Sequence, residues 1–496
     1  MQKLEKTGGD TDRTLPTYER AALRERILHI GFGAFARAFL TTILDETLDA
    51  NGEPENRDWG MVAVRLNSGV EDLDALERED CRHWVLAADD ERTDVRRIDA
   101  VVATCHPLRD GLAALLGRFA RPELAIVSLT ITEKGYCTRD GRLDPENAGI
   151  LRDLATPLAP ATAIGVIVEG LRLRRAAGLA GLTVLSCDNL PENGHVCRAA
   201  VLDFARARDE GLASWIEANV SFPCTMVDRI VPALDTDGRD MLARAGIAAD
   251  AGIVCEPFRQ WVVEDDFAAG RPDFSIAGAR FVDDVRPFEE MKLRMLNGSH
   301  TFLACLGQIA GHATIAECMD DPLFRAAARG LMLEEQAPTL SLPDGHDLAA
   351  YAEALLARFS NSRLKHRTAQ IATDTSQKLP QRLLAPIRRH LAAGTPWPRL
   401  ALGVAGWLAF CRGKDEAGVA LALNDPLSGR IAEIVAGNDD GPGYVRAILA
   451  LDAVVPADLA ANADFVSLVE AAYLELRREG VRATLARLAD APRSPA

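Results

Sequence analysis

The sequence lacks a long apolar run and a leader-like segment, and both absences narrow the class of protein. In its 496 residues no stretch of about 18 or more apolar residues occurs, so no membrane-spanning helix is predicted. The segment from Met1 to Arg13 is polar and carries both charge signs, unlike the apolar centre of a signal peptide. We therefore expect a soluble, cytoplasmic protein.

Paired cysteines and an excess of positive charge are also missing. The ten cysteines are spread from Cys81 to Cys411 without a C-x-x-C pair, which is typical of reduced thiols rather than of a disulfide framework or a zinc site. A formal net charge of −16 argues against nucleic acid or an anionic membrane as the main partner. A phosphate-bearing cofactor remains compatible, because local amides and helix dipoles hold such groups.

Buried-strand patterns alternate with helical patterns over the first part of the chain. The strand-like runs lie at 26–33, 59–66, 124–131 and 182–187, and helical periodicity covers 34–48, 161–177 and 193–213. Such alternation predicts a parallel sheet with helices on both faces. The stretch 95–105 fits neither pattern cleanly.

The pattern changes near residue 285. Beyond it, amphipathic helices such as 289–309, 348–359 and 465–488 follow one another with almost no strand candidates. We predict an α/β dinucleotide-binding domain over 1–285, with a parallel-rich sheet. A mainly α-helical substrate-binding and catalytic domain is predicted over 286–496.

A glycine turn follows the first predicted strand. Gly31 and Gly33 stand between that strand and a helix, where glycines let the backbone turn sharply and approach a pyrophosphate. The same spacing also occurs in tight turns for steric reasons alone, and Ala36 replaces the third glycine. The residues predicted to contact the cofactor here are Gly31, Phe32, Gly33, Ala34, Phe35 and Arg37.

The residues that would select between NAD and NADP give no clear answer. The second strand is followed by Arg65 and Asn67 instead of an acidic residue, while Glu71 and Asp72 come late. Either Arg65 or Asn67 could tolerate a 2′-phosphate, so these residues leave the choice open.

A lysine-bearing helix is the most informative segment for chemistry. At 3.6 residues per turn, Asn297 lies about 140° and His300 about 80° from Lys292, so all three can line one side of a cleft. A lysine of depressed pKa can exchange a proton with an alkoxide, while an amide and an imidazole stabilise its charge. The alternative is a solvated helix on which Lys292 pairs with Glu289. Asn297-Gly298 is poor helix-forming sequence, which favours a functional role.

Polar residues also follow two of the predicted strands, where open α/β sheets place their ligands. Thr132, Glu133 and Lys134 come after one strand and are further predicted cofactor-binding residues, and Asp188 and Asn189 come after another strand. Capping or turn formation would explain each group equally well. The sequence contains neither H-E-x-x-H nor a zinc-dehydrogenase cysteine pattern, and no Tyr-x-x-x-Lys pair at a strand end. A metal-free lysine mechanism therefore remains.

Several long motifs together resemble one family. They are GFGAFARA (31–38), SLTITEKGY (128–136), SCDNLPENG (186–194), FPCTMVDRIVPA (222–233), CEPFRQWVVEDDF (255–267) and MKLRMLNGSH (291–300). In this order they resemble the long-chain mannitol dehydrogenase family, which includes polyol dehydrogenases and hexuronate reductases. The resemblance runs roughly from Pro16 to Leu488. It implies a Rossmann-type N-terminal domain, a mainly helical C-terminal domain and an active site between them.

The resemblance also implies roles for individual residues. Lys292 matches the general acid/base, and Asn297 and His300 match the residues that position and polarise the reacting oxygen. Glu289 matches a glutamate that passes protons between the lysine and solvent. Substrate-binding positions are matched by Asn189, Asp228 and Lys378.

Within the family, segments 370–382, 334–338 and 400–407 resemble fructuronate reductases. The implied reaction is the reversible, NAD-dependent reduction of D-fructuronate to D-mannonate. His366, Arg367, Lys378 and Arg382 could bind the uronate carboxylate, unless this cluster is a solvated helix face.

Two departures from the family pattern bear on the prediction of the substrate more than on the prediction of the reaction. Ala36 to Phe39 replace a His-Arg-Ala-His segment, and Thr375 replaces a glycine in a turn, where a β-branched residue resists positive φ.

Other functions remain open at this point. One is a polyol or other aldonate dehydrogenase of the same family, acting on mannitol, arabinitol or a tagaturonate–altronate pair. Another is a non-catalytic dinucleotide-binding regulatory protein, and a third is oxidative decarboxylation of a 3-hydroxy acid. The expected partner is a sugar acid or polyol, and the expected assembly is a monomer or small homo-oligomer.

Overall fold

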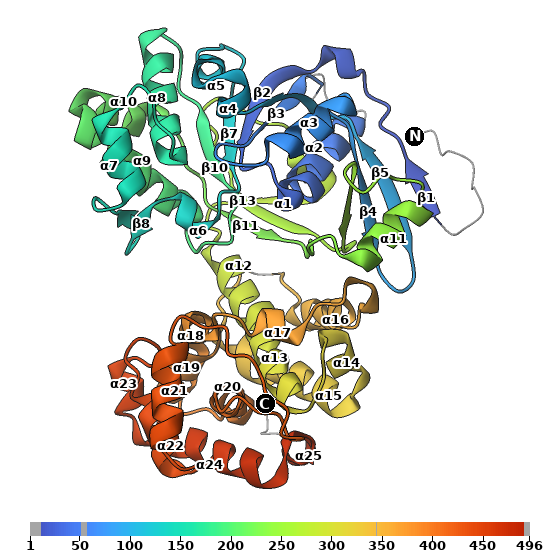
Figure 1. Cartoon of the computed structure of the whole chain (residues 1–496), viewed down its shortest axis with the longest axis vertical. Helices are drawn as coiled ribbons and strands as arrows, with labels where there is room; N and C mark the ends of the chain where they lie inside the picture. The colour runs from blue at the N-terminus through green and yellow to red at the C-terminus, as the bar shows by residue number, and fades with distance from the viewer. Residues whose placement is uncertain (1–10, 51–56, 344, 491–496) are drawn as a thin grey trace. The chain divides into compact units, whose positions relative to one another are not determined.

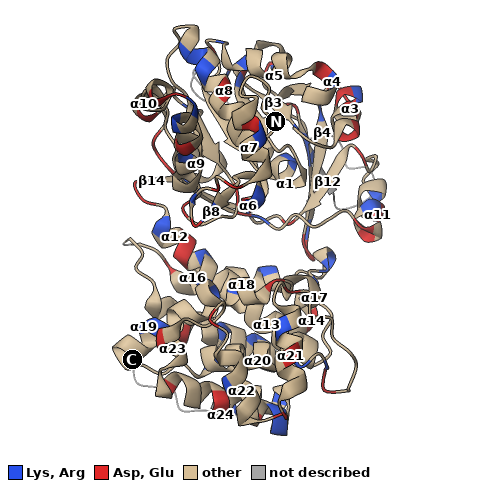
Figure 2. Cartoon of the chain, turned by 60° about the vertical axis from the view of Figure 1, so that its left-hand side comes forward, with Lys and Arg blue, Asp and Glu red and all other residues tan. Residues whose placement is uncertain are grey.

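The computed structural model describes residues 11–50, 57–343 and 345–490. The chain divides into two compact units, Met1–Arg286 and Pro287–Ala496 (Figure 1). Across the described ranges, no helix combines the length and the apolarity needed to cross a membrane. In Figure 2, acidic and basic residues are interspersed along surface helices such as α11 (Thr236–Arg244).

The N-terminal unit is built on a five-stranded parallel sheet with the order β10-β7-β2-β3-β6. Its strands are β2 (Arg24–Ile30), β3 (Trp59–Val64), β6 (Val101–Cys105), β7 (Ile126–Leu129) and β10 (Thr183–Ser186). The order reverses between β2 and β7, and ligands of such sheets bind beyond the carboxyl ends of the strands at that point.

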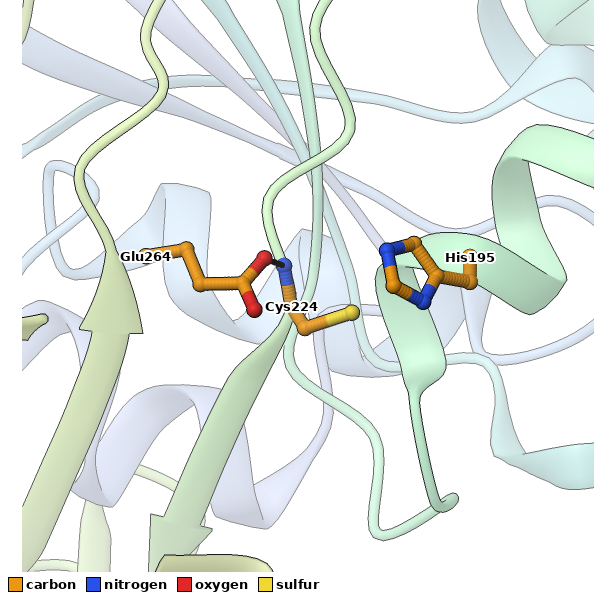
Figure 3. A group of neighbouring side chains, drawn as sticks. All are labelled: His195, Cys224 and Glu264. Atoms are coloured by element: carbon orange, nitrogen blue, oxygen red, sulfur yellow. Dashed lines mark hydrogen bonds between the residues drawn. The ribbon is translucent and has the colours of Figure 1, made fainter. Parts of the chain in front are cut away.

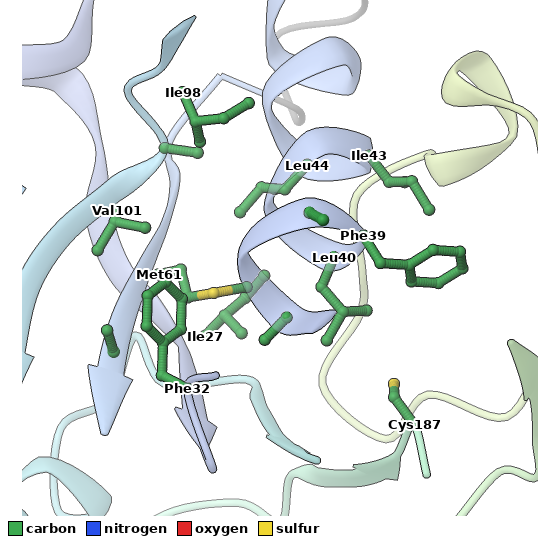
Figure 4. Close-up of a cluster of buried hydrophobic side chains, with 14 of the residues drawn as sticks. Ile27, Phe32, Phe39, Leu40, Ile43, Leu44, Met61, Ile98, Val101 and Cys187 are labelled. Carbon is green, nitrogen blue, oxygen red and sulfur yellow. The ribbon is translucent and has the colours of Figure 1, made fainter. Parts of the chain in front are cut away.

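Both faces of this sheet are covered, which explains the continuous apolar runs of its strands. Successive residues of a strand, such as Ile27 and Leu28, belong to two different core clusters on opposite faces of the sheet. The Ile27 face packs against α2 (Leu40–Asp49), as Figure 4 shows. The Leu28 face packs against residues of α5 (Leu112–Phe119), α8 (Ala163–Ala176) and α9 (Asn193–Arg208).

Three smaller sheets complete the unit. A mixed sheet has the order β1-β5-β4-β12, and a second has the order β11-β13-β14. Their strands are β1 (Thr11–Thr14), β4 (His83–Ala88), β5 (Thr93–Ile98), β12 (Gly252–Cys255), β11 (Thr225–Asp228), β13 (Gln260–Glu264) and β14 (Ala279–Val282), with β8 (Thr138–Arg139) and β9 (Arg142–Leu143) forming a two-stranded ribbon.

Several predicted elements are divided in the structure. The helix expected at 34–48 is α1 (Ala34–Ala38) followed by α2, with a break at Phe39. The helix expected at 193–213 ends at Arg208, because Asp209 caps a new helix, α10 (Glu210–Asn219). The unclear stretch 95–105 contains the end of β5 and all of β6. The remaining elements here are η1 (Arg20–Ala22), α3 (Val70–Arg78), α4 (Pro107–Asp110), α6 (Thr132–Gly135), α7 (Ala148–Ala155), η3 (Phe274–Ala277) and α12 (Arg286–Met291).

The C-terminal unit is helical around two buried helices. Every residue of α13 (Ser299–Ile309) is buried, and so is every residue of α20 from Leu400 to its end (Pro398–Cys411). Glu335 caps α20, because its carboxylate accepts hydrogen bonds from the amides of Arg399 (2.9 Å) and Leu400 (2.8 Å).

The other elements of this unit surround α13 and α20. They are η4 (Lys292–Gly298), α14 (Ile315–Asp320), α15 (Pro322–Gly330), η5 (Leu331–Gln336), η6 (Ala337–Thr339), α16 (Leu348–Phe359), η7 (Ser362–Leu364), α17 (Thr368–Ile371), α18 (Thr375–Leu379), η8 (Pro380–Leu384), α19 (Ala385–Ala393), α21 (Ser428–Gly437), α22 (Pro442–Leu449), α23 (Ala457–Ala460), α24 (Ala463–Glu479) and α25 (Val481–Asp490). The predicted fold class, a parallel-rich α/β unit followed by a mainly α-helical one, is confirmed.

Candidate active site

The glycine turn in the N-terminal unit is fixed by its neighbours. Gly31 has a φ of 95°, and a Cβ at this position would overlap the carbonyl oxygen of Thr130. The amides of Gly31 and Phe32 both donate to the oxygen of Val64, at 2.9 and 3.0 Å. The turn therefore joins the ends of β2, β3 and β7, and only glycine fits position 31.

A buried hydrogen-bond chain supports this turn from below. His29 contacts Ser128 Oγ through Nδ1 (2.8 Å) and Thr130 Oγ1 through Nε2 (2.9 Å). Thr130 Oγ1 in turn donates to the oxygen of Gly31 at 2.8 Å. Burial lowers the pKa of His29 to about 3, so the imidazole is neutral.

Asp188 shapes the loop after β7. Its carboxylate accepts hydrogen bonds from the amides of Ile131 (2.9 Å) and Thr132 (2.8 Å) and from the hydroxyl of Tyr136 (2.7 Å). Thr132 has a φ of 62°, an unusual conformation for a β-branched residue that these bonds hold in place. Asp188 is buried, and burial raises its pKa. In this structure it forms the turn and positions the residues beside it.

A cleft of about 730 Å³ opens at the carboxyl ends of β2, β3 and β7. Four of the predicted cofactor residues line it: Gly31, Gly33, Thr132 and Lys134. The sequence stretch 65–68 also lines it, as do Arg152 and residues 161–163, which sequence patterns did not single out. Among the described residues that line the cleft, three are cations and none is acidic. This lining suits a ligand that carries phosphate groups.

The other predicted cofactor residues lie outside the lining. The Phe32 side chain is buried, with its ring 6.0 Å from that of His29, and Phe35 stacks on Phe39 at 4.9 Å. Ala34 and Glu133 are exposed. Arg37 Nη2 donates to the oxygen of Asp250 (3.4 Å). The two predicted substrate residues of this unit are also separate from the cleft lining: Asn189 is exposed beyond β10, and Asp228 is the buried last residue of β11.

The lysine segment of the C-terminal unit is a π-helix, so the α-helical phase expected for it is wrong. η4 begins at Lys292 and ends at Gly298. Hydrogen bonds in a π-helix run from residue i to residue i+5, so Asn297 completes one turn above Lys292. The wider turn therefore brings these two residues closer to the same face than 3.6 residues per turn would allow. Glu289 lies in α12, immediately before this segment.

Two further π-helices, η5 and η8, pack against η4 around Gly298. A Cβ at Gly298 would lie 2.6 Å from Gln336 Nε2 of η5 and 2.9 Å from the Arg382 oxygen of η8. Ser299 Oγ also donates to Gln336 Oε1 at 3.2 Å. The absence of a side chain at Gly298 thus lets three irregular helices meet beside Asn297. Single-turn π-helices of this kind often mark functional sites.

Asn297 and His300 each have a side-chain nitrogen that is buried and has no hydrogen-bond partner among the described residues. These atoms are Asn297 Nδ2 and His300 Nε2. The His300 ring lies 4.4 Å from Phe359 and 4.9 Å from His366. Burial lowers the pKa of His300 well below its usual value, and the nearby charge of Arg382 adds to this effect. The imidazole is therefore neutral, and it can donate one hydrogen bond to a ligand oxygen.

Arg382 links this group to η8. Its Nη1 donates to the carbonyl oxygen of Asn297 (3.4 Å) and to Thr301 Oγ1 (3.1 Å). Burial lowers its pKa to about 10, and no carboxylate within the described chain forms an ion pair with it. Burial lowers the pKa of Lys378, and the nearby Arg382 charge lowers it further. Lys378 Nζ donates to the carbonyl oxygens of Ile371 (3.3 Å) and Thr373. Two cations therefore lie near one another, and one of them, Arg382, contacts Asn297.

The other residues of the expected basic cluster are less close. His366 contacts His300, but Arg367 is exposed and lines a different hollow, together with Lys365 and His312. The turn before α18 has its positive φ (55°) at Asp374, while Thr375 is the first helical residue. Replacement of glycine by Thr375 is therefore compatible with this turn.

Among the described residues, one group of potential metal ligands lies in the N-terminal unit. His195, Cys224 and Glu264 each offer an atom within 4.8 Å of the others (Figure 3). Glu264 accepts hydrogen bonds from the amides of Cys224 (2.9 Å) and Val285 (3.4 Å). These bonds join β11, β13 and the segment before α12, and they account for the position of the carboxylate.

Comparisons with known proteins cover nearly the whole chain. The family described as the mannitol dehydrogenase Rossmann domain matches residues 25–276, and the mannitol dehydrogenase C-terminal domain matches residues 284–477. D-mannonate oxidoreductase of Escherichia coli (strain K12) is 49% identical over 478 residues, covering 95% of this chain and 97% of that protein. Polyol:NADP oxidoreductase of Gluconobacter oxydans (strain 621H) is 35% identical over 436 residues, or 86% and 88% of the two chains. The solved ternary complex of Pseudomonas fluorescens mannitol 2-dehydrogenase with NAD and D-mannitol superposes with a TM-score of 0.83 at 38% identity, covering 97% of each chain.

Proposed function

Because the chain belongs to the mannitol dehydrogenase family of oxidoreductases, we propose that it reversibly reduces D-fructuronate to D-mannonate with NADH. The N-terminal unit is the dinucleotide-binding part, and the helical unit supplies the catalytic residues and most of the substrate contacts. The similarity to D-mannonate oxidoreductase supports this substrate pair.

The cleft of the N-terminal unit fits a dinucleotide. Gly31 and Gly33 leave room for the pyrophosphate, and Lys134 supplies positive charge at the rim. Bound NADH supplies the hydride for the carbonyl carbon. The hydrogen bonds that Asp188 accepts from Ile131 and Thr132 hold the loop after β7, whose residues line the cleft and would contact the bound nucleotide.

The lysine segment supplies the acid–base chemistry without a metal. Lys292 gives its proton to the oxygen as the carbonyl becomes an alcohol, and it takes that proton back in oxidation. Asn297 Nδ2 and neutral His300 Nε2 donate hydrogen bonds to the same oxygen as its charge grows, which satisfies two buried donors. Glu289, three residues before Lys292, exchanges the proton with solvent.

The observation that carries the substrate class is the Arg382 guanidinium, which is partly buried and has no acidic partner in the described chain. A buried cation is costly unless it is paired. The carboxylate of a sugar acid, bound between Arg382 and Lys378, would supply the missing charge, whereas a polyol would not. A keto-uronate is therefore favoured over fructose or another neutral ketose.

NADH oxidation in parallel assays with fructuronate, tagaturonate, fructose and xylulose tests this proposal. We expect kcat/KM for fructuronate to exceed that for fructose by about a hundredfold or more, which corresponds to roughly 3 kcal/mol. Preference for fructose or xylulose would overturn the uronate assignment and leave a polyol dehydrogenase.

An Arg382→Gln variant sharpens the test. Any distortion of the lysine segment would affect both substrates, so it cancels in the ratio of kcat/KM for fructuronate to kcat/KM for fructose. We expect the preference for fructuronate over fructose to fall by about tenfold or more. An unchanged ratio would show that Arg382 does not bind the carboxylate.

A further inference from the structure

The end of β3 lacks the group that NAD-selective sites of this fold use. Enzymes that select NAD place an acidic residue there to bind the 2′-hydroxyl of the adenosine ribose. Here Val64 ends the strand, and Arg65, Leu66, Asn67 and Ser68 follow and line the cleft. The first acidic residues beyond them belong to α3, which begins at Val70.

The Arg65 guanidinium is held in place at this edge. Its Nη1 donates to Asp72 Oδ2 in α3, and the group lies across Gly69, where any Cβ would overlap it. Gly69 has a φ of 79° and directly precedes α3. One side of the guanidinium is thus used to fix its position, while its side chain remains 26% exposed beside the cleft. A planar cation fixed in this way is prepared to bind a phosphate.

The described residues that line the cleft carry positive charge, from Arg65, Lys134 and Arg152, and none of them is acidic. Burial lowers the pKa of Arg37 and the nearby Arg65 charge adds to this effect, whereas Asp72 and Asp250 oppose it. Asp72 and Asp250 are not part of that lining, and the Asp72 side chain is 65% exposed. A second negative group at this edge would therefore meet net attraction.

We infer that the cleft binds NADPH as well as NADH, with Arg65 as the partner of the 2′-phosphate and Asn67 and Ser68 as neighbouring hydrogen-bond donors. This inference rests on the proposed function, since it concerns the same nucleotide cleft. It makes Arg65 the residue that determines nucleotide selectivity. The competing role for Arg65 is stacking on the adenine ring, which would strengthen binding of both nucleotides equally.

Binding measurements separate these roles without relying on turnover. NADH and NADPH are titrated separately, with nucleotide fluorescence as the signal, into the wild-type protein and the Arg65→Gln variant. In the wild type we expect the two dissociation constants to agree within about tenfold. In Arg65→Gln we expect NADPH to bind at least about tenfold more weakly, while NADH changes by less than about threefold. Loss of the exposed Arg65–Asp72 pair costs little stability, so the variant should fold.

Arg152→Gln is the matched control, because Arg152 is another cation in the lining of the same cleft. It should affect both nucleotides to the same extent. Displacement of NADH by adenosine 2′,5′-bisphosphate and by 5′-AMP adds a direct probe, and Arg65→Gln should weaken only the bisphosphate.

Three results would overturn the inference: wild-type NADPH binding more than about a hundredfold weaker than NADH binding, an equal loss of both nucleotides in Arg65→Gln, or an unchanged NADPH affinity in that variant. Tight NADH binding alongside any of these would leave the proposed function intact. Failure of both nucleotides to bind the wild type would instead contradict the proposed function itself.

Discussion

Asn297 Nδ2 and His300 Nε2 are buried donors that no group of the described chain satisfies. Leaving such a donor unpaired costs about 1–3 kcal/mol, so both side chains are expected to gain a partner when a ligand oxygen binds. Asn297 follows Lys292 by one turn of the π-helix, and in the proposed reaction Lys292 exchanges a proton with that same oxygen. At the scale of single residues, this combination supports carbonyl reduction more strongly than a solvated helix face.

Replacement of Lys292 tests the chemistry directly. We expect Lys292→Ala to lower kcat by about a thousandfold or more, because the alkoxide loses its proton donor, while the affinity for NADH stays nearly unchanged. Lys414→Ala, at an exposed position of the same unit, is the control. Rapid-kinetic measurement of NADH oxidation together with nucleotide titration checks both parts. Normal turnover in Lys292→Ala would rule out the lysine mechanism.

At the scale of elements, the contact between three π-helices at Gly298 shapes the site. We expect Gly298→Ala to reduce kcat/KM by about tenfold or more and to destabilise the protein by about 1–3 kcal/mol, because the new methyl group would press on Gln336 and on the Arg382 carbonyl. Thermal unfolding and steady-state kinetics measure the two effects.

Gly429→Ala is the matched control for this substitution. Gly429 lies in α21, and a Cβ there would meet no atom within 4 Å. Alanine should therefore leave activity unchanged and stabilise the helix by up to about 1 kcal/mol. Equal behaviour of the two variants would contradict the importance of close packing at Gly298.

The buried carboxyl group of Glu335, which caps α20, should make the stability of the protein depend on pH. Burial raises the pKa of Glu335 to about 7, above the value near 4.5 expected in the unfolded chain. Below pH 4.5 the Glu335 carboxyl group is protonated in both the folded and the unfolded chain. As the pH rises through 7, the buried group must ionise in the folded chain, so the stability that its neutral form provides is lost. The loss is on the order of 2–3 kcal/mol.

Urea unfolding of the wild type and of Glu335→Gln at several pH values between 5 and 8 isolates this effect. We expect the stability of the wild type to fall more steeply with rising pH than that of the variant, whatever their absolute difference. Parallel pH profiles would show that Glu335 titrates normally.

At the scale of the whole molecule, the proposed nucleotide-binding residues and the proposed acid–base residues belong to separate compact units. The proposed reaction gives the task of stabilising the oxyanion to Lys292, Asn297 and His300, without a metal ion. We therefore expect dialysis against a chelator to change kcat and KM by less than about twofold. A large loss of activity that zinc restores would contradict this, and Cys224→Ser would then show whether the group in Figure 3 is responsible.

Sequence patterns predicted much of this architecture. Apolar runs ending in glycine or polar residues correctly indicated β2, β3, β7 and β10, because strands buried on both faces need continuous apolar sequence. The predicted resemblance to the mannitol dehydrogenase family is confirmed, as is the prediction of an oxidoreductase. Patterns failed for the short strands β11 and β13, whose four and five residues carry too little periodicity to be recognised.

The sequence by itself determined which chemical groups are present and in which order. It also indicated a tight glycine turn after the first strand, predicted that the strands are buried, and placed a lysine, an amide and an imidazole within nine residues. Only the tertiary structure decided that this segment is a π-helix, since η5 and η8 pack against Gly298 from positions far along the chain. Tertiary structure also brought Arg382 to Asn297 and Asp188 to Thr132, because such contacts depend on chain reversal and close packing that no local pattern records.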